Sequence, residues 1–122
     1  MYNEIAKDLL SFITKNPTQF HVIDNTKKEL LENGFTELLE GQPWKLEQGK
    51  SYFVTRNYSA IIAFKMGTDL HNYSFNITAA HSDSPAFKIK EHAELSVKGK
   101  YMQLNTEGYG GMLDAPWFDR PL

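Results

Sequence analysis

The sequence predicts helices packed on a β-sheet, in an α/β or α+β layer arrangement. Apolar residues recur at helical spacing near the amino terminus, whereas after residue 35 they occur in short stretches with alternation. A hydrophobic share of 41% and an aromatic share of 13% are typical of a packed globule. The length of 122 residues is compatible with one domain around one core.

The first helix is predicted over residues 3 to 14, where one stripe of apolar side chains is formed by Ile5, Leu9, Phe12 and Ile13. Asn16-Pro17 ends it, because a residue before proline disfavours the helical region. A second helix is predicted over residues 18 to 33, with Thr18 as its N-cap and Gly34 in a left-handed C-cap.

Short strands follow the helices. Residues 51 to 56 and 60 to 65 predict a hairpin with a tight turn at residues 57 to 59. The β-branched and aromatic stretch "SFNITAA", residues 74 to 80, predicts a buried strand that delivers His81 at its carboxyl end.

The last third alternates apolar and polar residues in "AFKIK" (86 to 90) and "ELSVK" (94 to 98), which predicts two half-buried strands. "KGK" at 98 to 100 predicts a turn into "YMQLN". "GYGG", at 108 to 111, lacks the Lys-Ser/Thr of a phosphate loop and is interpreted as a turn or a close backbone approach.

Composition excludes several partner classes. The formal net charge of -2, with interspersed signs, offers no basic surface for nucleic acid, and no basic amphipathic helix or long apolar run predicts membrane binding. The chain has no cysteine and starts without a basic, cleavable leader, so we predict a cytoplasmic protein.

His81 and Asp83 are the strongest candidates for chemistry. In an extended chain, side chains two residues apart project to the same side, so the carboxylate can contact one ring nitrogen and leave the other free for a metal. The alternative is an ordinary hydrogen-bonded polar pair at a strand end. In open α/β sheets ligands bind beyond the carboxyl ends of strands, which is where the prediction places this pair.

Other candidate residues have ordinary structural interpretations. Ser82 and Ser84 lack the Gly-X-Ser-X-Gly frame of a serine hydrolase. Asp119 precedes Arg120, which predicts a salt bridge, and Trp117 and Phe118 are interpreted as core or interface residues. The remaining histidines are scattered along the chain: His21, His71 and His92.

Four ordered segments resemble the M18 family of metallopeptidases, the aspartyl aminopeptidases: "DLLSFITKNPTQFHVI", "LLENGFTELLEGQPWKLEQGKSYFVTRNYSAIIAF", "AAHSDSPAFKIK" and "LNTEGYGGMLDAPWFDRPL". The third is similar to the family signature Gly-Ala-His-Thr-Asp-Ser-Pro. The resemblance implies an α/β fold, the amino-terminal part of a zinc-exopeptidase-like catalytic domain, with two helices followed by strands of a mixed sheet. Residues 1 to 122 would then end before or at the start of the inserted dimerisation domain.

The resemblance also implies an activity. The parent protein would be a metalloaminopeptidase that uses two Zn²⁺ ions to release amino-terminal residues, preferentially Asp or Glu, from peptides, and it would form a homo-oligomer. His81 would bind one metal, and Asp83 would be the catalytic carboxylate that orients this histidine. The other metal ligands have no counterpart here, so the isolated chain is predicted to be inactive. The alternative is a non-catalytic binding or scaffold domain that retains the fold.

Several residues depart from the family pattern. Ala79 stands where glycine is usual, and Gln19 stands where proline is usual. Asp114 and Pro116 replace the residues that family members more often carry before the tryptophan, so the role of that loop stays open.

Overall fold

The chain forms two compact units in the computed structural model, Met1–Asp83 and Ser84–Leu122. The structure describes residues 2–69, 71–72 and 74–119. Each unit is therefore described by itself.

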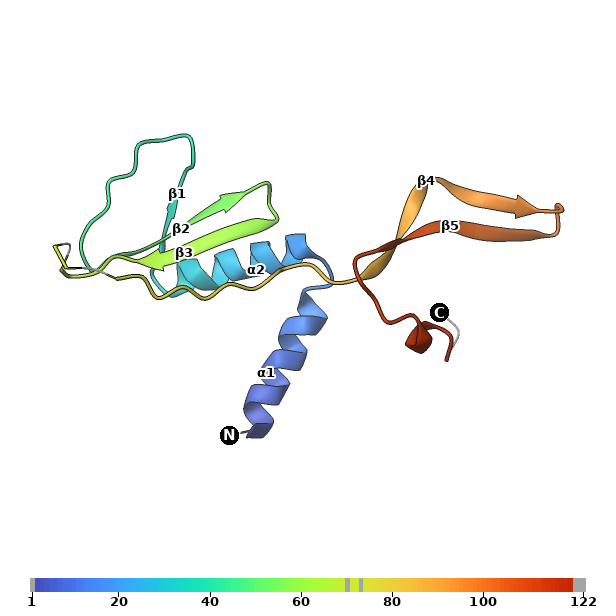
Figure 1. The fold of residues 1–122 in the computed structure, drawn as a ribbon, viewed down its shortest axis with the longest axis horizontal. Coiled ribbons are helices and arrows are strands. Elements are labelled where there is room, and N and C mark those ends of the chain that lie inside the picture. Colours follow the sequence, from blue (N-terminus) through green and yellow to red (C-terminus); the bar gives the residue numbers. More distant parts are fainter. Residues whose placement is uncertain (1, 70, 73, 120–122) are drawn as a thin grey trace. The chain divides into compact units, whose positions relative to one another are not determined.

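Two helices open the first unit, as predicted: α1 spans Tyr2–Lys15 and α2 spans Gln19–Glu32 (Figure 1). Thr18 is the extended N-cap residue of α2, but its hydroxyl makes no capping hydrogen bond. It lies 2.8 Å from Nδ1 of His21 instead. The N-cap position of Thr18 was predicted correctly, but the predicted capping hydrogen bond of its hydroxyl is not observed.

Gly34 ends α2 in the left-handed conformation that the sequence predicts, with φ +79°. Its N–H donates to the carbonyl of Leu31 at 3.1 Å, and the N–H of Phe35 donates to the carbonyl of Leu30 at 3.0 Å. This pair of bonds is a Schellman motif, which satisfies carbonyls that the helix end leaves unpaired.

A three-stranded mixed sheet follows, in the order β1-β2-β3. Strand β1 (Thr36–Leu38) runs parallel to β2 (Ser51–Arg56), and β2 runs antiparallel to β3 (Ala60–Lys65). The hairpin of β2 and β3 has the predicted bounds. Strand β1 was not predicted, and its parallel pairing makes the sheet mixed.

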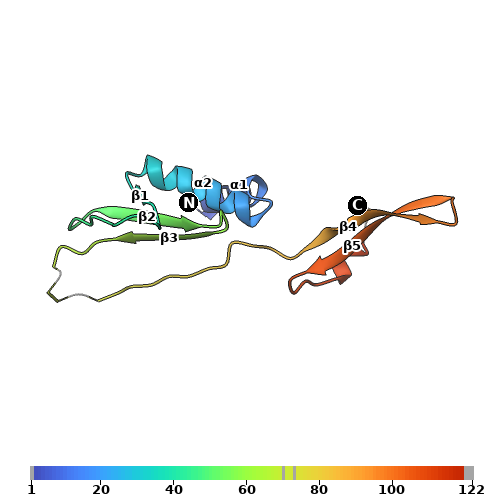
Figure 2. The same cartoon turned by 90° about the horizontal axis from the view of Figure 1, so that it is seen from above.

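The core of the first unit lies between α2 and this sheet, since α2 lies along one face of the sheet in both views (Figures 1 and 2). The fully buried Phe53 and the buried Ile23 form it, and Tyr52 is buried as well. Adjacent strand residues point to opposite faces, so Tyr52 faces away from Phe53. Its ring lies 5.9 Å from that of Phe64, its partner across β2 and β3.

Residues 74–80 form no strand, so the buried strand predicted there is wrong. They run as an extended, exposed segment, in which Phe75 is 78% and Ile77 is 83% exposed. β-Branched residues favour a pleated surface, but a strand also needs a neighbour to pair with its backbone. No described residue supplies that neighbour.

The second unit is a long two-stranded ribbon of β4 (Ala86–Val97) and β5 (Tyr101–Tyr109). The strands predicted at 86–90 and 94–98 are paired halves of β4, separated by a register shift between Ile89 and Glu94. The side-chain amide of Asn105 donates to the carbonyl of His92 inside this irregularity, at 3.0 Å. The predicted turn at 98–100 is confirmed, with Lys98 and Gly99 at positive φ.

After β5 the chain passes close to Pro85, the residue that precedes β4. Gly110 has φ +77°, and a Cβ there would lie 3.4 Å from Cα of Pro85, so the predicted close backbone approach is confirmed. A short 3-10 helix, η1 (Ala115–Trp117), follows. The ring of Trp117 meets that of Phe87 edge to face, with the centroids 4.8 Å apart.

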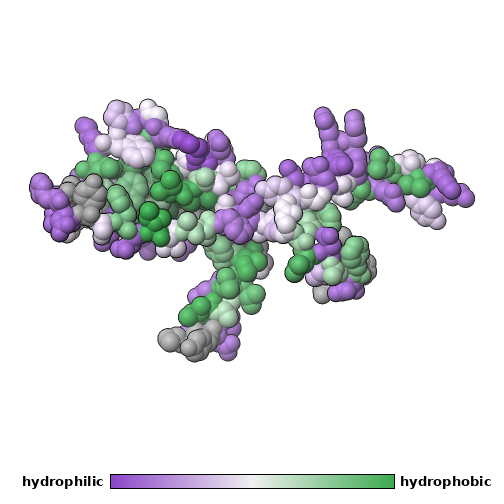
Figure 3. Space-filling view, viewed as in Figure 1, coloured by the Kyte–Doolittle hydropathy of each residue, from purple (hydrophilic) through white to green (hydrophobic). Residues whose placement is uncertain are grey.

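Large apolar side chains remain exposed in both units. Along α1, where Figure 3 shows apolar surface, the exposed fraction is 62% for Ile5 and 58% for Leu9. On the ribbon it is 60% for Ile89 and 64% for Leu104.

Candidate metal-binding site

His81 and Asp83 contact each other as their spacing predicts. Nδ1 of His81 lies 3.1 Å from Oδ1 of Asp83 and 2.8 Å from the main-chain oxygen of the same residue. Oxygens of both kinds accept hydrogen bonds, so Nδ1 must donate. When the ring is neutral, Nε2 therefore keeps its lone pair.

The imidazole is also accessible. The side chain of His81 is 81% exposed, and that of Asp83 is 42% exposed. An oriented ring with an open nitrogen is the arrangement that metal-binding histidines usually have.

The pair lies beside the turn that follows β2. Ser82, between the two residues, donates a hydrogen bond from its hydroxyl to the carbonyl of Ser59 at 3.1 Å. Because β1 runs parallel to β2, both strands end toward this turn. The predicted location at the carboxyl end of a strand over residues 74–80 is not observed, because that strand is absent. The pair lies instead beside the carboxyl end of β2 and the turn that follows it.

An open hollow of about 530 Å³ adjoins the pair. Residues 80–83 and 59–61 form part of its wall, and the apolar remainder comes mainly from the helices: Phe12, Val22 and Ile23. The hollow therefore places the imidazole beside apolar surface in the first unit.

The imidazole of His81 and the carboxylate of Asp83 suit zinc only as part of a larger set of ligands. A neutral imidazole with a hydrogen-bonded Nδ1 is a usual zinc ligand, and a zinc site takes three or more protein ligands. Within the described residues, no group of three or more His, Cys, Asp or Glu could hold a metal ion. This part of the chain offers one imidazole with a carboxylate in contact with it.

The other histidines lie in ordinary structural settings. His21 pairs with Thr18, and the backbone N–H of His71 donates to Oδ1 of Asp69 at 2.9 Å. His92 lies in the irregular stretch of β4, where its carbonyl accepts from Asn105.

Of the two carboxyl-terminal aromatic candidates, Trp117 packs against another ring among the described residues and Phe118 does not. Trp117 packs on Phe87, in agreement with its predicted packing role, whereas Phe118 is 83% exposed. The predicted salt bridge of Asp119 cannot be placed because Arg120 lies outside the described residues.

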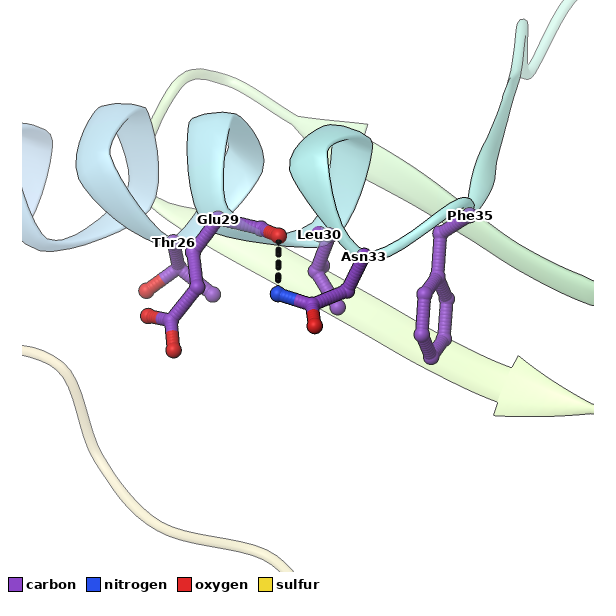
Figure 4. Close-up of a pocket in the computed structure, with 5 residues that line it drawn as sticks. All are labelled: Thr26, Glu29, Leu30, Asn33 and Phe35. Atoms are coloured by element: carbon purple, nitrogen blue, oxygen red, sulfur yellow. Dashed lines mark hydrogen bonds between the residues drawn. The ribbon is translucent and has the colours of Figure 1, made fainter.

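A second hollow lies at the end of α2 (Figure 4). Its lining comprises Thr26, Glu29, Leu30, Asn33 and Phe35. The Asn33 side-chain amide donates to the carbonyl of Glu29 at 2.8 Å, as in Figure 4. This lining has one carboxylate and lacks a histidine, so it does not resemble a metal centre.

Comparisons with known proteins establish the family. The family model described as "Aminopeptidase I zinc metalloprotease (M18)" matches residues 12–122, so the chain belongs to the M18 family of zinc metallopeptidases. "Probable M18 family aminopeptidase 2" of Clostridium novyi is 48% identical over 125 residues, covering all of this chain and 29% of that protein. "Aspartyl aminopeptidase 1" of Schizosaccharomyces pombe is 42% identical over 120 residues, covering 96% of this chain and 25% of that protein.

Solved structures agree on the fold. The structure described as "Cryo-EM structure of the Ape4 and Nbr1 complex" has a TM-score of 0.84 and 42% identity, covering 94% of this chain and 22% of that one. The mApe1 structure of Chaetomium thermophilum has a TM-score of 0.79 and 37% identity, covering 96% and 27%. The α/β fold and its place in M18 are therefore confirmed. The chain spans less than a third of the relatives that it matches.

Within the described part of the chain, no helix is long and apolar enough to span a bilayer.

Proposed function

We propose that residues 1–122 are the amino-terminal portion of the catalytic domain of an aminopeptidase, and that the complete protein removes amino-terminal Asp or Glu residues from peptides. Membership of M18 supports the enzyme class, since the matching family is described as a zinc metalloprotease. Two relatives are named aspartyl aminopeptidases, which supports the acidic preference.

The contact between His81 and Asp83 is the observation that carries this proposal. Asp83 contacts Nδ1 of the imidazole, which acts as the donor, and Nε2 of His81 would bind one of two zinc ions. When bound, the zinc pair would polarise the scissile carbonyl and activate water for attack. Asp83 is negatively charged and would also raise the basicity of the ligand.

We expect the remaining ligands to come from residues outside this chain, because the described residues contain no group of three or more His, Cys, Asp or Glu that could hold a metal ion. We therefore expect the 122-residue chain alone to be inactive. The proposal places it before or at the start of the dimerisation domain.

Assembly and location belong to the same proposal. A similar structure is described as the "mApe1 dodecamer" of S. cerevisiae, with a TM-score of 0.75 and 28% identity. We propose that the complete protein is likewise a homo-oligomer, acts in the cytoplasm, and accepts peptides with an acidic amino terminus.

The test uses the complete gene product that contains these residues. Rates of hydrolysis are compared for the p-nitroanilides of Asp, Glu and Leu, before and after chelation and after zinc is restored. We expect the acidic substrates to react fastest, chelation to abolish the activity, and zinc to restore it. A zinc-loaded product that hydrolyses none of them would contradict the proposal and would favour the non-catalytic binding domain.

A further inference from the structure

We infer that Ser82 is a positioning residue for the proposed zinc ligand, because its hydroxyl fastens the segment of His81 and Asp83 to the turn between β2 and β3. The inference rests on the proposed function, since it concerns the same imidazole. It assigns a role to a serine for which the sequence analysis rejected a nucleophilic role.

The hydrogen bond from Ser82 to Ser59 joins residues 23 positions apart in the chain. The contacts of the His81 ring, in contrast, are with Asp83, two residues away. Those local contacts orient the ring relative to its own segment. They do not fix where that segment lies on the sheet, which a long-range bond does.

The described residues that directly precede His81 do not belong to a β-ladder. Residues 74–80 form no strand, so ladder hydrogen bonds do not hold the chain that leads to His81. The Ser82 bond starts from the middle of the His81–Asp83 segment and joins it to the hairpin, so it can influence the position of the ring.

The turn that receives the bond is well defined. Asn57 and Tyr58 have φ of 51° and 56°, and the N–H of Ser59 donates to the carbonyl of Arg56 at 3.2 Å. Successive residues at positive φ match the twist of hairpin strands. Strand β2, which leads into the turn, contains the fully buried Phe53, so the anchor point is continuous with the core.

The two hydrogen-bonded serines and the proposed zinc ligand differ in solvent exposure. Ser59 and Ser82 are half-buried, whereas the side chain of His81 is 81% exposed. Loss of the hydroxyl would remove the donor to the main-chain carbonyl of the half-buried Ser59. The Ser82 hydroxyl thus binds toward the sheet while the neighbouring imidazole remains open to solvent and to a metal.

The test compares Ser82→Ala with Ser82→Thr, which keeps the hydroxyl, and with Ser74→Ala, an exposed serine of the same extended segment. All are made in the complete gene product. Zinc affinity is measured by competition with a chromophoric chelator, and hydrogen exchange is measured on the zinc-free protein.

For Ser82→Ala we expect zinc affinity to fall roughly three- to tenfold. We also expect faster exchange in the peptides that cover residues 57–61 and 80–84. Ser82→Thr and Ser74→Ala should behave as the wild type.

Any of three results overturns the inference: unchanged zinc affinity in Ser82→Ala, an equal loss in Ser82→Thr, or an equal loss in Ser74→Ala. In each case, zinc binding by the wild type leaves the proposed function intact. A wild-type protein that binds no zinc overturns the proposed function, and the inference with it.

Discussion

Nδ1 of His81 has two acceptors on one residue, the main-chain oxygen of Asp83 at 2.8 Å and its Oδ1 at 3.1 Å. The ring tautomer is thus held by a backbone atom that no substitution removes and by a carboxylate that mutation can delete. The two residues should therefore differ in how strongly their loss affects zinc binding.

Asp83→Ala in the complete gene product should weaken zinc binding by about tenfold and not abolish it. The main-chain oxygen still accepts from Nδ1, but the ligand loses the neighbouring negative charge. Chelator competition measures the affinity. Asp69→Ala is the matched control. Asp69 lies two residues before His71 and accepts a hydrogen bond from its backbone N–H. Zinc affinity equal to the wild type in Asp83→Ala would contradict the role of the carboxylate.

Gly34→Ala should lower the free energy of unfolding by about 1 kcal/mol, because the Schellman motif holds this residue at φ +79°. Urea denaturation of the chain measures the change. Gly41→Ala provides the control, since Gly41 does not have positive φ and a Cβ there would meet nothing within 4 Å. Equal effects of the two substitutions would show that the left-handed conformation is unimportant.

Phe53→Ala should cost about 3 to 5 kcal/mol, because a fully buried ring is replaced by a cavity. This cost is comparable to the whole stability of a small domain, so the cooperative thermal transition of the first unit should disappear. Circular dichroism follows that transition. Phe118→Ala removes a ring that is 83% exposed and should change stability by less than about 0.5 kcal/mol. A cooperative transition retained in Phe53→Ala would show that the core lies elsewhere.

The carboxyl group of Asp24 should titrate below its ordinary pKa, because Nζ of Lys28 donates a hydrogen bond to it at 2.6 Å. A lowered pKa in the folded state means that the stabilisation is present above the unfolded pKa and is lost as pH falls through the folded value. Both side chains are exposed, so the effect on stability is small and salt-sensitive. An NMR titration of Lys28→Ala should show the pKa rising toward normal. An unchanged value would exclude the pair as its cause.

Local patterns in the sequence were sufficient for the helices and the β2–β3 hairpin. The spacing of apolar residues predicted α1, and Gly34 predicted the end of α2. Strand β1 was missed because three residues carry no periodicity, and its pairing with β2 depends on contacts across the loop. Residues 74–80 were wrongly predicted as a strand because propensity does not supply the neighbour that a strand needs.

For the candidate site, too, the sequence predicted the local contact and missed the long-range one. The two-residue spacing of His81 and Asp83 predicted their contact. The bond between Ser82 and Ser59 could not be predicted, because it joins residues that only the fold brings together. The irregular stretch of β4 was likewise visible in the sequence only as a break between two alternating segments.

The most direct test of the account is the zinc content of the complete gene product and of its His81→Ala variant, measured by elemental analysis alongside the rate of hydrolysis of Asp-p-nitroanilide. The account predicts bound zinc and activity in the wild type, with reduced zinc and no activity in a folded His81→Ala variant. Equal zinc content and equal rates in the two proteins would contradict it.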